Sequence, residues 1–303
     1  MREIDIEMQS ENTKTFRTVD PRNALNDLMG KEWMIETKSF IYQKGLGSKH
    51  PHAQIERLHP APYSFQDIGR LILFFTKAGD TVLDPFGGVG STAKACALNG
   101  RFCTSIELSA EWHALSIKRL ETEVATGSSQ EHTFINADCI PTLKTFDDDV
   151  FDFMVTSPPY WAILNKKADH KVKKGRVAHA LATTYSDDSR DLGNIARYED
   201  FLNTLVHDVF KECGRVIKEK HYMCIVVSDF RNKSEFISFH SDLIQMLSHI
   251  DVGDSCALSL QGVKVLAQNH KSLLPYGYPF AYVENIHHQY ILIFRKIKKG
   301  KEK

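Results

Sequence analysis

The sequence predicts an α/β fold built on a mainly parallel, doubly wound sheet. From Phe65 onward, short apolar stretches typical of strands alternate with amphipathic stretches typical of helices, and this alternation implies βαβ units. A glycine-rich turn follows the first of these strands and opens a helix, which is where such sheets bind ligands. With 303 residues, the chain is long enough for one large domain with insertions.

The expected elements follow in a regular order. A first helix is indicated by Ile68, Leu71, Ile72 and Phe75, which have the i, i+3, i+4, i+7 spacing of one helix face. The expected strands are Thr81–Asp84, Phe102–Ile106, Thr133–Asn136, Phe151–Thr156, Tyr222–Val227 and Tyr290–Arg295. The helices between them are expected at Thr92–Leu98, Ala110–Val124, Leu202–Val216 and Phe239–Ile250.

Two stretches, residues 162–197 and 254–289, break this rhythm. Both are rich in polar, His, Gly and Pro residues, so we expect functional loops at the edge of the sheet. The organisation expected is an N-terminal segment, residues 1–58, that leads into a domain covering residues 59–303.

Composition excludes several classes of protein. No apolar run approaches the roughly 20 residues of a membrane helix, and the polar stretch Met1–Thr15 is not a secretory signal. The six cysteines show no metal-ligand spacing, so we expect reduced, buried thiols in a cytoplasmic protein without a metal site. The 38 basic and 38 acidic residues cancel, so overall charge does not argue for a nucleic-acid partner.

A candidate ligand loop, Asp84-Pro-Phe-Gly-Gly-Val-Gly-Ser-Thr92, ends the strand at Thr81–Asp84. Its glycines allow a tight turn, and the free N–H groups of the following helix can meet a carboxylate or phosphate. Glu107, at the end of the next strand, could accept both hydroxyls of a ribose. By itself the turn would fit NAD about as well, or a turn that merely needs glycine. Phe86, however, stands where the GxGxxG pattern of NAD enzymes has its first glycine.

The strongest signal is Ser157-Pro158-Pro159-Tyr160, which follows the strand at Phe151–Thr156. Two prolines fix two φ angles and remove two N–H donors, which leaves rigid carbonyl acceptors. Acceptors of this kind suit the methylation of a base amine, because its lone pair is delocalised into the ring and must be localised. The Ser157 side chain and the Pro158 carbonyl are the candidates for this role. Tyr160 offers a flat face for a base swung out of the duplex.

Together the two motifs resemble those of the DNA amino-methyltransferases of bacterial restriction-modification systems. The resemblance covers about residues 30 to 296. It implies a seven-stranded class I S-adenosylmethionine-dependent methyltransferase sheet of the Rossmann-like type, with S-adenosyl-L-methionine as the cofactor. Phe86, Gly87 and Gly90 would surround the methionine part, Glu107 would hold the ribose, and Asp138 would meet the adenine amino group.

The site residues expected on this basis form three sets. The catalytic set is Ser157, Pro158, Pro159 and Tyr160. The cofactor-binding set is His59, Pro60, Pro62, Asp84, Pro85, Phe86, Gly87, Gly88, Gly90, Ser91, Thr92, Glu107, Leu108, Asp138, Cys139 and Ser157. The DNA-binding set, from a stretch with six basic residues against one acid, is Lys166, Lys167, Lys171, Lys173, Lys174 and Arg176.

The spelling Ser-Pro-Pro-Tyr resembles the cytosine-N4 branch of the family, whereas the adenine-N6 branch more often has Asp in place of Ser157. In many members the Pro-Pro-Tyr segment precedes the cofactor loop, but here it follows. The position of the target-recognition region in those members therefore does not give its position in this chain. The candidates are 162–197 and, with Gln261, Gln268, Asn269 and His270, 254–289. The implied partners are duplex DNA, read over a short sequence, and a cognate restriction endonuclease.

Three alternatives stay open at this point. The same chemistry could act on RNA, although about 58 residues before His59 leave little room for an added RNA-binding domain. The chain could be a non-catalytic DNA-binding partner on a methyltransferase fold, although the intact motifs argue against it. An NAD-dependent dehydrogenase would lack the right glycine spacing and has no use for Pro-Pro-Tyr.

Overall fold

The computed structural model describes residues 18–43, 46, 49–161, 188–268, 271 and 273–300. Within these ranges, nine strands form one sheet in the order β1-β10-β11-β6-β5-β2-β3-β4, with β9 paired to β10. The strands of this sheet are β1 (Phe40–Tyr42), β2 (Thr81–Asp84), β3 (Phe102–Glu107), β4 (Thr133–Asn136), β5 (Phe151–Thr156), β6 (Ile217–Val227), β9 (Asp251–Val252), β10 (Cys256–Ala267) and β11 (His288–Lys298). A separate hairpin consists of β7 (Phe230–Asn232) and β8 (Glu235–Ile237).

The sheet has the class I methyltransferase topology that the sequence predicts. Strands β4, β3, β2, β5 and β6 are parallel neighbours, and β11 pairs antiparallel with β6. Strand β10 is antiparallel to β11 and therefore runs in the direction of the parallel strands. These seven strands form the predicted sheet, and the short strands β1 and β9 extend it to nine.

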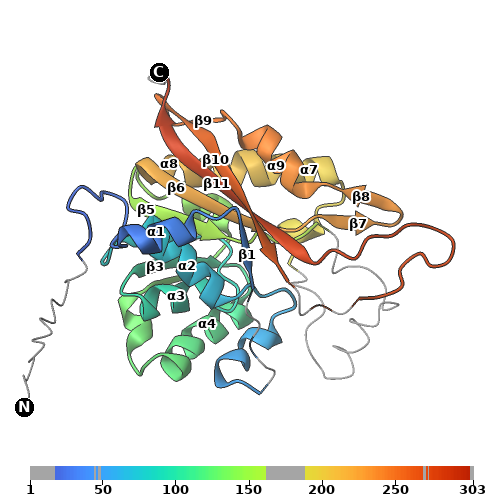
Figure 1. The fold of residues 1–303 in the computed structure, drawn as a ribbon, viewed down its shortest axis with the longest axis horizontal. Helices are drawn as coiled ribbons and strands as arrows, with labels where there is room; N and C mark the ends of the chain where they lie inside the picture. The colour runs from blue at the N-terminus through green and yellow to red at the C-terminus, as the bar shows by residue number, and fades with distance from the viewer. Residues whose placement is uncertain are drawn as a thin grey trace, which may run out of the picture.

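Helices cover both faces of the sheet (Figure 1). They are α1 (Gly30–Glu36), α2 (Phe65–Phe75), α3 (Ser91–Leu98), α4 (Ala110–Glu123), α5 (Cys139–Leu143), α7 (Tyr198–Thr204), α8 (Lys211–Val216) and α9 (Phe239–Leu247). A π-helical segment, η5 (Leu205–Phe210), joins α7 to α8, and short 3-10 turns lie at η1 (Pro51–Ala53), η2 (Glu56–Leu58), η3 (Ser128–Glu131) and η4 (Leu192–Asn194).

The two cores follow from the alternation of side chains along each strand. On β2, Val82 packs with α2 and α3 on one face, while Leu83 packs on the other face with α5, α7, α8 and α9. Phe153 and Met154 on β5 divide in the same way. Because both faces are covered, the middle residues of these strands are apolar on both faces rather than alternating with polar residues, and the polar Asp84, Asp152 and Thr156 are buried as well.

The expectation for residues 254–289 was wrong in its first half. Strand β10 occupies Cys256–Ala267 and lies inside the sheet between β1 and β11. Its pairing with β11 shifts between Leu260 and Gly262, and a bulge of this kind interrupts the period-2 pattern by which a strand is recognised in a sequence. Of the part that follows β10, the described residues 273–287 form a loop, as expected.

The N-terminal segment is joined to this sheet. Strand β1 pairs with β10, the Asn26 side chain donates to the Phe74 carbonyl over 2.6 Å, and Trp33 lies 5.1 Å from the Phe74 ring. The six cysteines are free and buried, as the sequence predicts. In the part of the chain that the structure describes, no helix has the length and apolar character needed to cross a bilayer.

Candidate active site

A pocket lies at the carboxyl ends of β2, β3, β4 and β5, the edge where parallel sheets bind ligands. Six stretches of the sequence line it: the residues before α2, the turn after β2, the end of β3 with the start of α4, the start of α5, the Pro-Pro segment after β5, and residues 190–192. The lining residues are His59, Ala61, Pro85, Phe86, Gly88, Ile106, Glu107, Leu108, Trp112, Ala137, Asp138, Cys139, Ser157, Pro158, Pro159, Arg190, Asp191 and Leu192.

Asp84 ties three of the surrounding segments together from behind the pocket wall. Its buried carboxylate accepts hydrogen bonds from Tyr63 Oη (2.7 Å), Thr92 Oγ1 (2.5 Å) and Thr156 Oγ1 (2.6 Å). The backbone N–H of Phe86 donates to the same carboxylate over 3.1 Å. Burial raises the pKa of Asp84, and these donors oppose that rise. The stretch just before α2, the glycine turn and the strand before Ser157 are thereby held in one arrangement.

The glycines of the turn after β2 are required by close packing. A Cβ at Gly87 would lie 2.0 Å from Ser105 Oγ on β3, and one at Gly90 would lie 3.1 Å from Ser116 Cα on α4. Gly88 and Gly90 also have positive φ angles of 50° and 76°, which residues other than glycine rarely adopt. The turn can therefore bring its backbone to the pocket only with glycine at these positions.

Glu107 lies at the end of β3 and faces the pocket. Its carboxylate accepts the backbone N–H groups of Gly88 and Ser109, each over 2.8 Å. Burial raises the pKa of Glu107 to about 7, and the two N–H donors only partly offset it. The group therefore titrates close to neutrality.

A buried network of charges supports the glycine turn from the side of α4. The Arg119 side chain, which is fully buried, donates to the Val89 carbonyl (3.2 Å) and to Ser91 Oγ (3.0 Å). It also pairs with Glu56 of η2 at 2.6 Å and with Glu123 at 3.1 Å. Lys94, buried as well, pairs with Glu123 at 2.5 Å. Arg119 thus fixes the turn to α4 and to the N-terminal segment.

Tyr160 lies beside the pocket rather than in its lining. Gln289 Nε2 on β11 donates to its hydroxyl over 3.3 Å, and that hydroxyl also hydrogen-bonds with the Ser157 side chain. The ring lies edge-on to Phe230 and Phe239, with centroid distances of 6.5 and 6.4 Å. Burial raises the pKa of Tyr160, so the phenol stays neutral.

A pair formed by buried Asp229 and half-buried His240 lies near Tyr160. Asp229, two residues after the end of β6, accepts from His240 Nδ1 at 2.7 Å, and the His240 ring stacks on Tyr290 with centroids 3.8 Å apart. The sequence analysis did not single out either residue. The available signal was that Asp229 follows the carboxyl end of a central strand.

The predicted cofactor residues divide between the pocket and its support. His59, Pro85, Phe86, Gly88, Glu107, Leu108, Asp138, Cys139 and Ser157 line the pocket, as do Pro158 and Pro159 of the catalytic set. The residues that lie behind this lining are Pro60, Pro62, Asp84, Gly87, Gly90, Ser91 and Thr92. The residues that the sequence analysis missed are Ala61, Ile106, Trp112, Ala137, Arg190, Asp191 and Leu192.

The predicted DNA-contact residues are placed only in part. Lys166, Lys167, Lys171, Lys173, Lys174 and Arg176 lie outside the described residues, as do Asn269 and His270. Residues 190–192, from the end of the 162–197 stretch, line the pocket instead. Gln268 is buried and donates to Gln43 and Gln289, so this conformation does not present it to a base edge.

The lining fits S-adenosylmethionine in its chemistry. Glu107, Asp138 and Asp191 contribute acidic groups that suit a ligand with a cationic sulfonium and ammonium, and apolar Ile106, Leu108 and Cys139 suit its adenine. Asp138 uses Oδ1 to cap α5 by accepting the Ile140 N–H at 2.9 Å. Within the described ranges, no cluster of three His, Cys, Asp or Glu residues could hold a metal ion.

A family model and several solved structures are similar to this chain. A family model described as DNA methylase, of the N6/N4 methyltransferases, matches residues 6–118, a range that contains the glycine turn and Glu107 but not Ser157–Tyr160. No curated protein matches the sequence.

Several solved structures are similar at low identity. TrmN from Thermus thermophilus is 15% identical with a TM-score of 0.47, covering 84% of this chain and 54% of TrmN. A proposed rRNA methylase from Clostridium thermocellum is 13% identical with a TM-score of 0.46, covering 78% of this chain and 99% of that one. A proposed DNA modification methylase, also from Thermus thermophilus and complexed with S-adenosyl-L-methionine, is 21% identical with a TM-score of 0.34, covering 54% of each chain. These scores are too low to carry an argument about substrate, and this chain spans only about half the length of TrmN.

The sheet order and the site define a class I methyltransferase fold. The family-model match, which includes the glycine turn, supports S-adenosyl-L-methionine as the cofactor. It also supports the predicted family, because residues 6–118 are similar to the DNA methylases that the model describes. The match does not separate the cytosine-N4 branch from the adenine-N6 branch.

Proposed function

We propose that the protein transfers a methyl group from S-adenosylmethionine to the exocyclic amine of a base swung out of duplex DNA, with cytosine N4 as the acceptor. The observation that carries the proposal is that Ser157, Pro158 and Pro159 line the same pocket as Phe86, Gly88 and Glu107. The group that would accept the methyl and the cofactor that would supply it are therefore recognised by adjacent walls of one pocket.

In this proposal the cofactor is held by the walls that precede the Pro-Pro segment. Glu107 accepts the ribose hydroxyls, Asp138 meets the adenine amino group, and the turn at Phe86–Gly90 meets the methionine end. When bound, S-adenosylmethionine supplies an electrophilic methyl group on a sulfonium. The chain itself supplies alignment, which is the larger part of what a methyl transfer needs from an enzyme.

The Pro-Pro-Tyr segment is proposed to prepare the amine. The Ser157 hydroxyl and the Pro158 carbonyl accept the hydrogens of the amine, which localises its lone pair toward the methyl group. The bound cofactor would supply the methyl group for this nitrogen and leave as S-adenosylhomocysteine, and the amine would release one proton to solvent. The Tyr160 ring provides the face on which the flipped base stacks, and its contacts with Gln289 and Ser157 support this orientation.

The family resemblance extends the proposal to a setting. We propose duplex DNA with a short recognition sequence as the substrate, a cognate restriction endonuclease as a partner in the same system, and the cytoplasm of a bacterial or archaeal cell as the location.

The test is incubation with methyl-labelled S-adenosylmethionine and either unmethylated plasmid DNA or total RNA, followed by digestion to nucleosides and mass spectrometry. The proposal predicts N4-methylcytosine from the DNA. N6-methyladenine would keep the chemistry and overturn the choice of base, whereas label in RNA alone would overturn the choice of substrate. DNA binding without any transfer would favour the non-catalytic partner.

A further inference from the structure

A loop with an unusual surface follows β10. Its residues 273–283, called here the aromatic loop, read Leu-Leu-Pro-Tyr-Gly-Tyr-Pro-Phe-Ala-Tyr-Val. Tyr278, Phe280 and Tyr282 are 81, 94 and 84% exposed, and Leu273 is 77% exposed. Three aromatic rings this exposed lie within five residues of one loop, and exposed apolar residues gathered in this way mark sites of interaction.

The aromatic loop is built to hold this shape. The Asn285 side chain accepts the Leu274 N–H at 2.9 Å and donates to the Leu274 carbonyl at 2.8 Å, which closes the base of the loop. The Phe280 and Ala281 N–H groups both donate to the Gly277 carbonyl, at 2.7 and 2.8 Å. Gly277 has a φ of 74°, and a Cβ there would lie 2.3 Å from the Ala281 carbonyl oxygen. Presenting the rings on an ordered turn lowers the entropy lost on binding.

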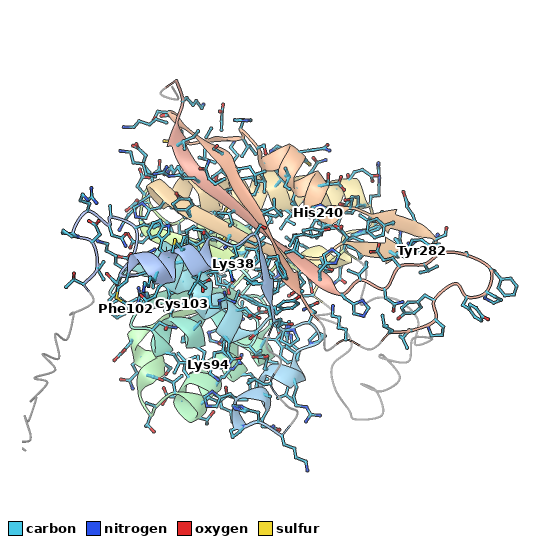
Figure 2. All side chains as sticks on the ribbon, viewed as in Figure 1. Lys38, Lys94, Phe102, Cys103, His240 and Tyr282 are labelled. Carbon is cyan, nitrogen blue, oxygen red and sulfur yellow. The ribbon has the colours of Figure 1, made fainter. Side chains whose placement is uncertain are left out.

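The position of the aromatic loop connects it with the candidate active site. Strand β10 runs in the direction of the parallel strands, so the loop leaves the sheet at the carboxyl edge, where the pocket lies. The chain re-enters the sheet at β11, where Gln289 contacts Tyr160. The loop projects on the same side as the β7–β8 hairpin (Figure 1). Figure 2 labels Tyr282 on this projection and Phe102 on the opposite side of the molecule.

The chemistry of the aromatic loop favours bases over phosphates. Residues 273–283 include no charged side chain, so they cannot neutralise phosphates as lysine and arginine do. Aromatic rings, in contrast, stack on any unpaired base, and apolar side chains can enter a base step that has been opened. A base that swings into the active site leaves such an opened step behind.

We propose that the aromatic loop contacts the DNA substrate directly, with Tyr278, Phe280 and Tyr282 stacking on bases exposed when the target base leaves the duplex. This inference rests on the proposed function for its choice of partner. The loop would stack on bases, whereas the basic residues predicted to bind DNA would contact the phosphates of the DNA backbone.

The experiment compares the full-length wild type with the combined variant Tyr278→Ser, Phe280→Ser, Tyr282→Ser. Binding to an unmethylated duplex fragment is measured at several salt concentrations. Phe102→Ser is the matched control, because Phe102 is an exposed aromatic residue (47%) at the opposite edge of the sheet. Because all three replaced rings are exposed, the variant is expected to unfold at the wild-type temperature and to bind the cofactor normally.

The variant should bind the fragment at least tenfold more weakly, since one base–aromatic stack accounts for about that factor. The slope of affinity against salt should not change, because stacking releases no counterions. A fragment with an abasic position opposite the target base should recover part of the lost affinity, because less of the opening must be driven by the protein.

Three outcomes would overturn the inference. They are wild-type affinity in the variant, a loss equal to that of Phe102→Ser, and, if the wild type self-associates, loss of that self-association in the variant without loss of DNA binding. The last would make a second copy of the chain the occupant of the loop. The proposed function is tested separately by the methyl-transfer assay, and it fails if the wild type transfers no methyl group to any nucleic acid.

Discussion

Glu107 should make cofactor affinity depend on pH near neutrality, and comparison with Glu107→Gln separates this effect from proton loss by the cofactor's own α-amino group, whose usual pKa of about 7.7–8.0 lies in the same range. Burial raises the pKa of this carboxyl to about 7 in the folded protein without ligand. In the proposed site the ribose hydroxyls donate to Glu107, so the ionised form is the competent one. The apparent dissociation constant is then the intrinsic constant divided by the ionised fraction.

The size of the effect follows from that pKa. About a tenth of the protein is ionised at Glu107 near pH 6 and about nine-tenths near pH 8, so affinity should rise about tenfold across this range. Isothermal titration calorimetry with S-adenosylmethionine measures it directly. Glu107→Gln is the control, because its amide does not titrate: it should bind more weakly than wild type at pH 8 and keep only the pH dependence that the cofactor's α-amino group contributes.

The stability of the protein without cofactor provides an independent check of the same pKa. Because the folded pKa of Glu107 lies above its usual value of 4.5, the folded state binds the proton more tightly than the unfolded state does. The contribution to stability is therefore complete below pH 4.5 and is lost as pH rises through about 7. Relative to Glu107→Gln, the wild type should lose about 3 kcal/mol of unfolding free energy across this window. Parallel curves of stability against pH for the two proteins, together with a cofactor affinity that is flat in the wild type, would refute the reasoning.

Three further predictions concern the residues that support the site and the aromatic ring proposed to stack on the base. Asp84→Ala removes the acceptor of four hydrogen bonds and leaves buried donors unpaired. It should lower the unfolding free energy measured by urea denaturation by at least about 3 kcal/mol. A loss below about 1 kcal/mol would show that Asp84 does not hold the three segments together. Arg119→Met leaves Glu123 and Glu56 without this buried partner. It should therefore lower the unfolding free energy by about 3–5 kcal/mol and weaken cofactor binding. A stable variant with normal cofactor binding would contradict the role of Arg119 in supporting the turn. Tyr160→Ala should abolish methyl transfer but leave the cofactor affinity measured by calorimetry within about twofold of wild type, because Tyr160 lies outside the pocket lining. Tyr160→Phe keeps the stacking face and should retain activity. Lost cofactor affinity in Tyr160→Ala would contradict the assignment.

The parallel half of the fold was predictable because its central strands are buried on both faces and are followed by glycine or proline residues that end a strand. Thr81–Asp84 and Phe151–Thr156 have the predicted bounds, and each ends in a motif that only a strand end would place in a pocket. Strand β10 was not predictable, because the bulge near Gln261 and Gly262 disrupts its alternation and gives the segment the look of a loop. Strand β1 has three residues, too few for a pattern to show.

The site was predictable where one motif carries several of its residues. Phe86, Gly88, Glu107 and Ser157 could be assigned because each stands at or just after a strand end. Arg190, Asp191 and Leu192 could not, because no local pattern says which distant loop returns to the pocket. The same holds for Gln289, whose contact with Tyr160 spans 129 positions of the sequence.

The roles of individual predicted residues were also beyond the sequence. Asp84 and Thr92 belong to the cofactor motif, yet their side chains hydrogen-bond to each other and to Thr156 and Tyr63 behind the pocket. Glycine positions show a comparable mixture, since Gly87 and Gly90 are fixed by packing against β3 and α4. A motif identifies the site, while only the folded arrangement separates the residues that face a ligand from those that hold the walls.

The most direct test of the central claim, that the glycine turn and the Pro-Pro-Tyr segment form one site, is a crystal structure with the demethylated cofactor product, S-adenosylhomocysteine. We predict the ribose on Glu107, the adenine beside Asp138 and Leu108, and the sulfur facing Ser157 and Pro158. Product bound elsewhere, or bound with its sulfur turned away from Ser157 and Pro158, would contradict the account.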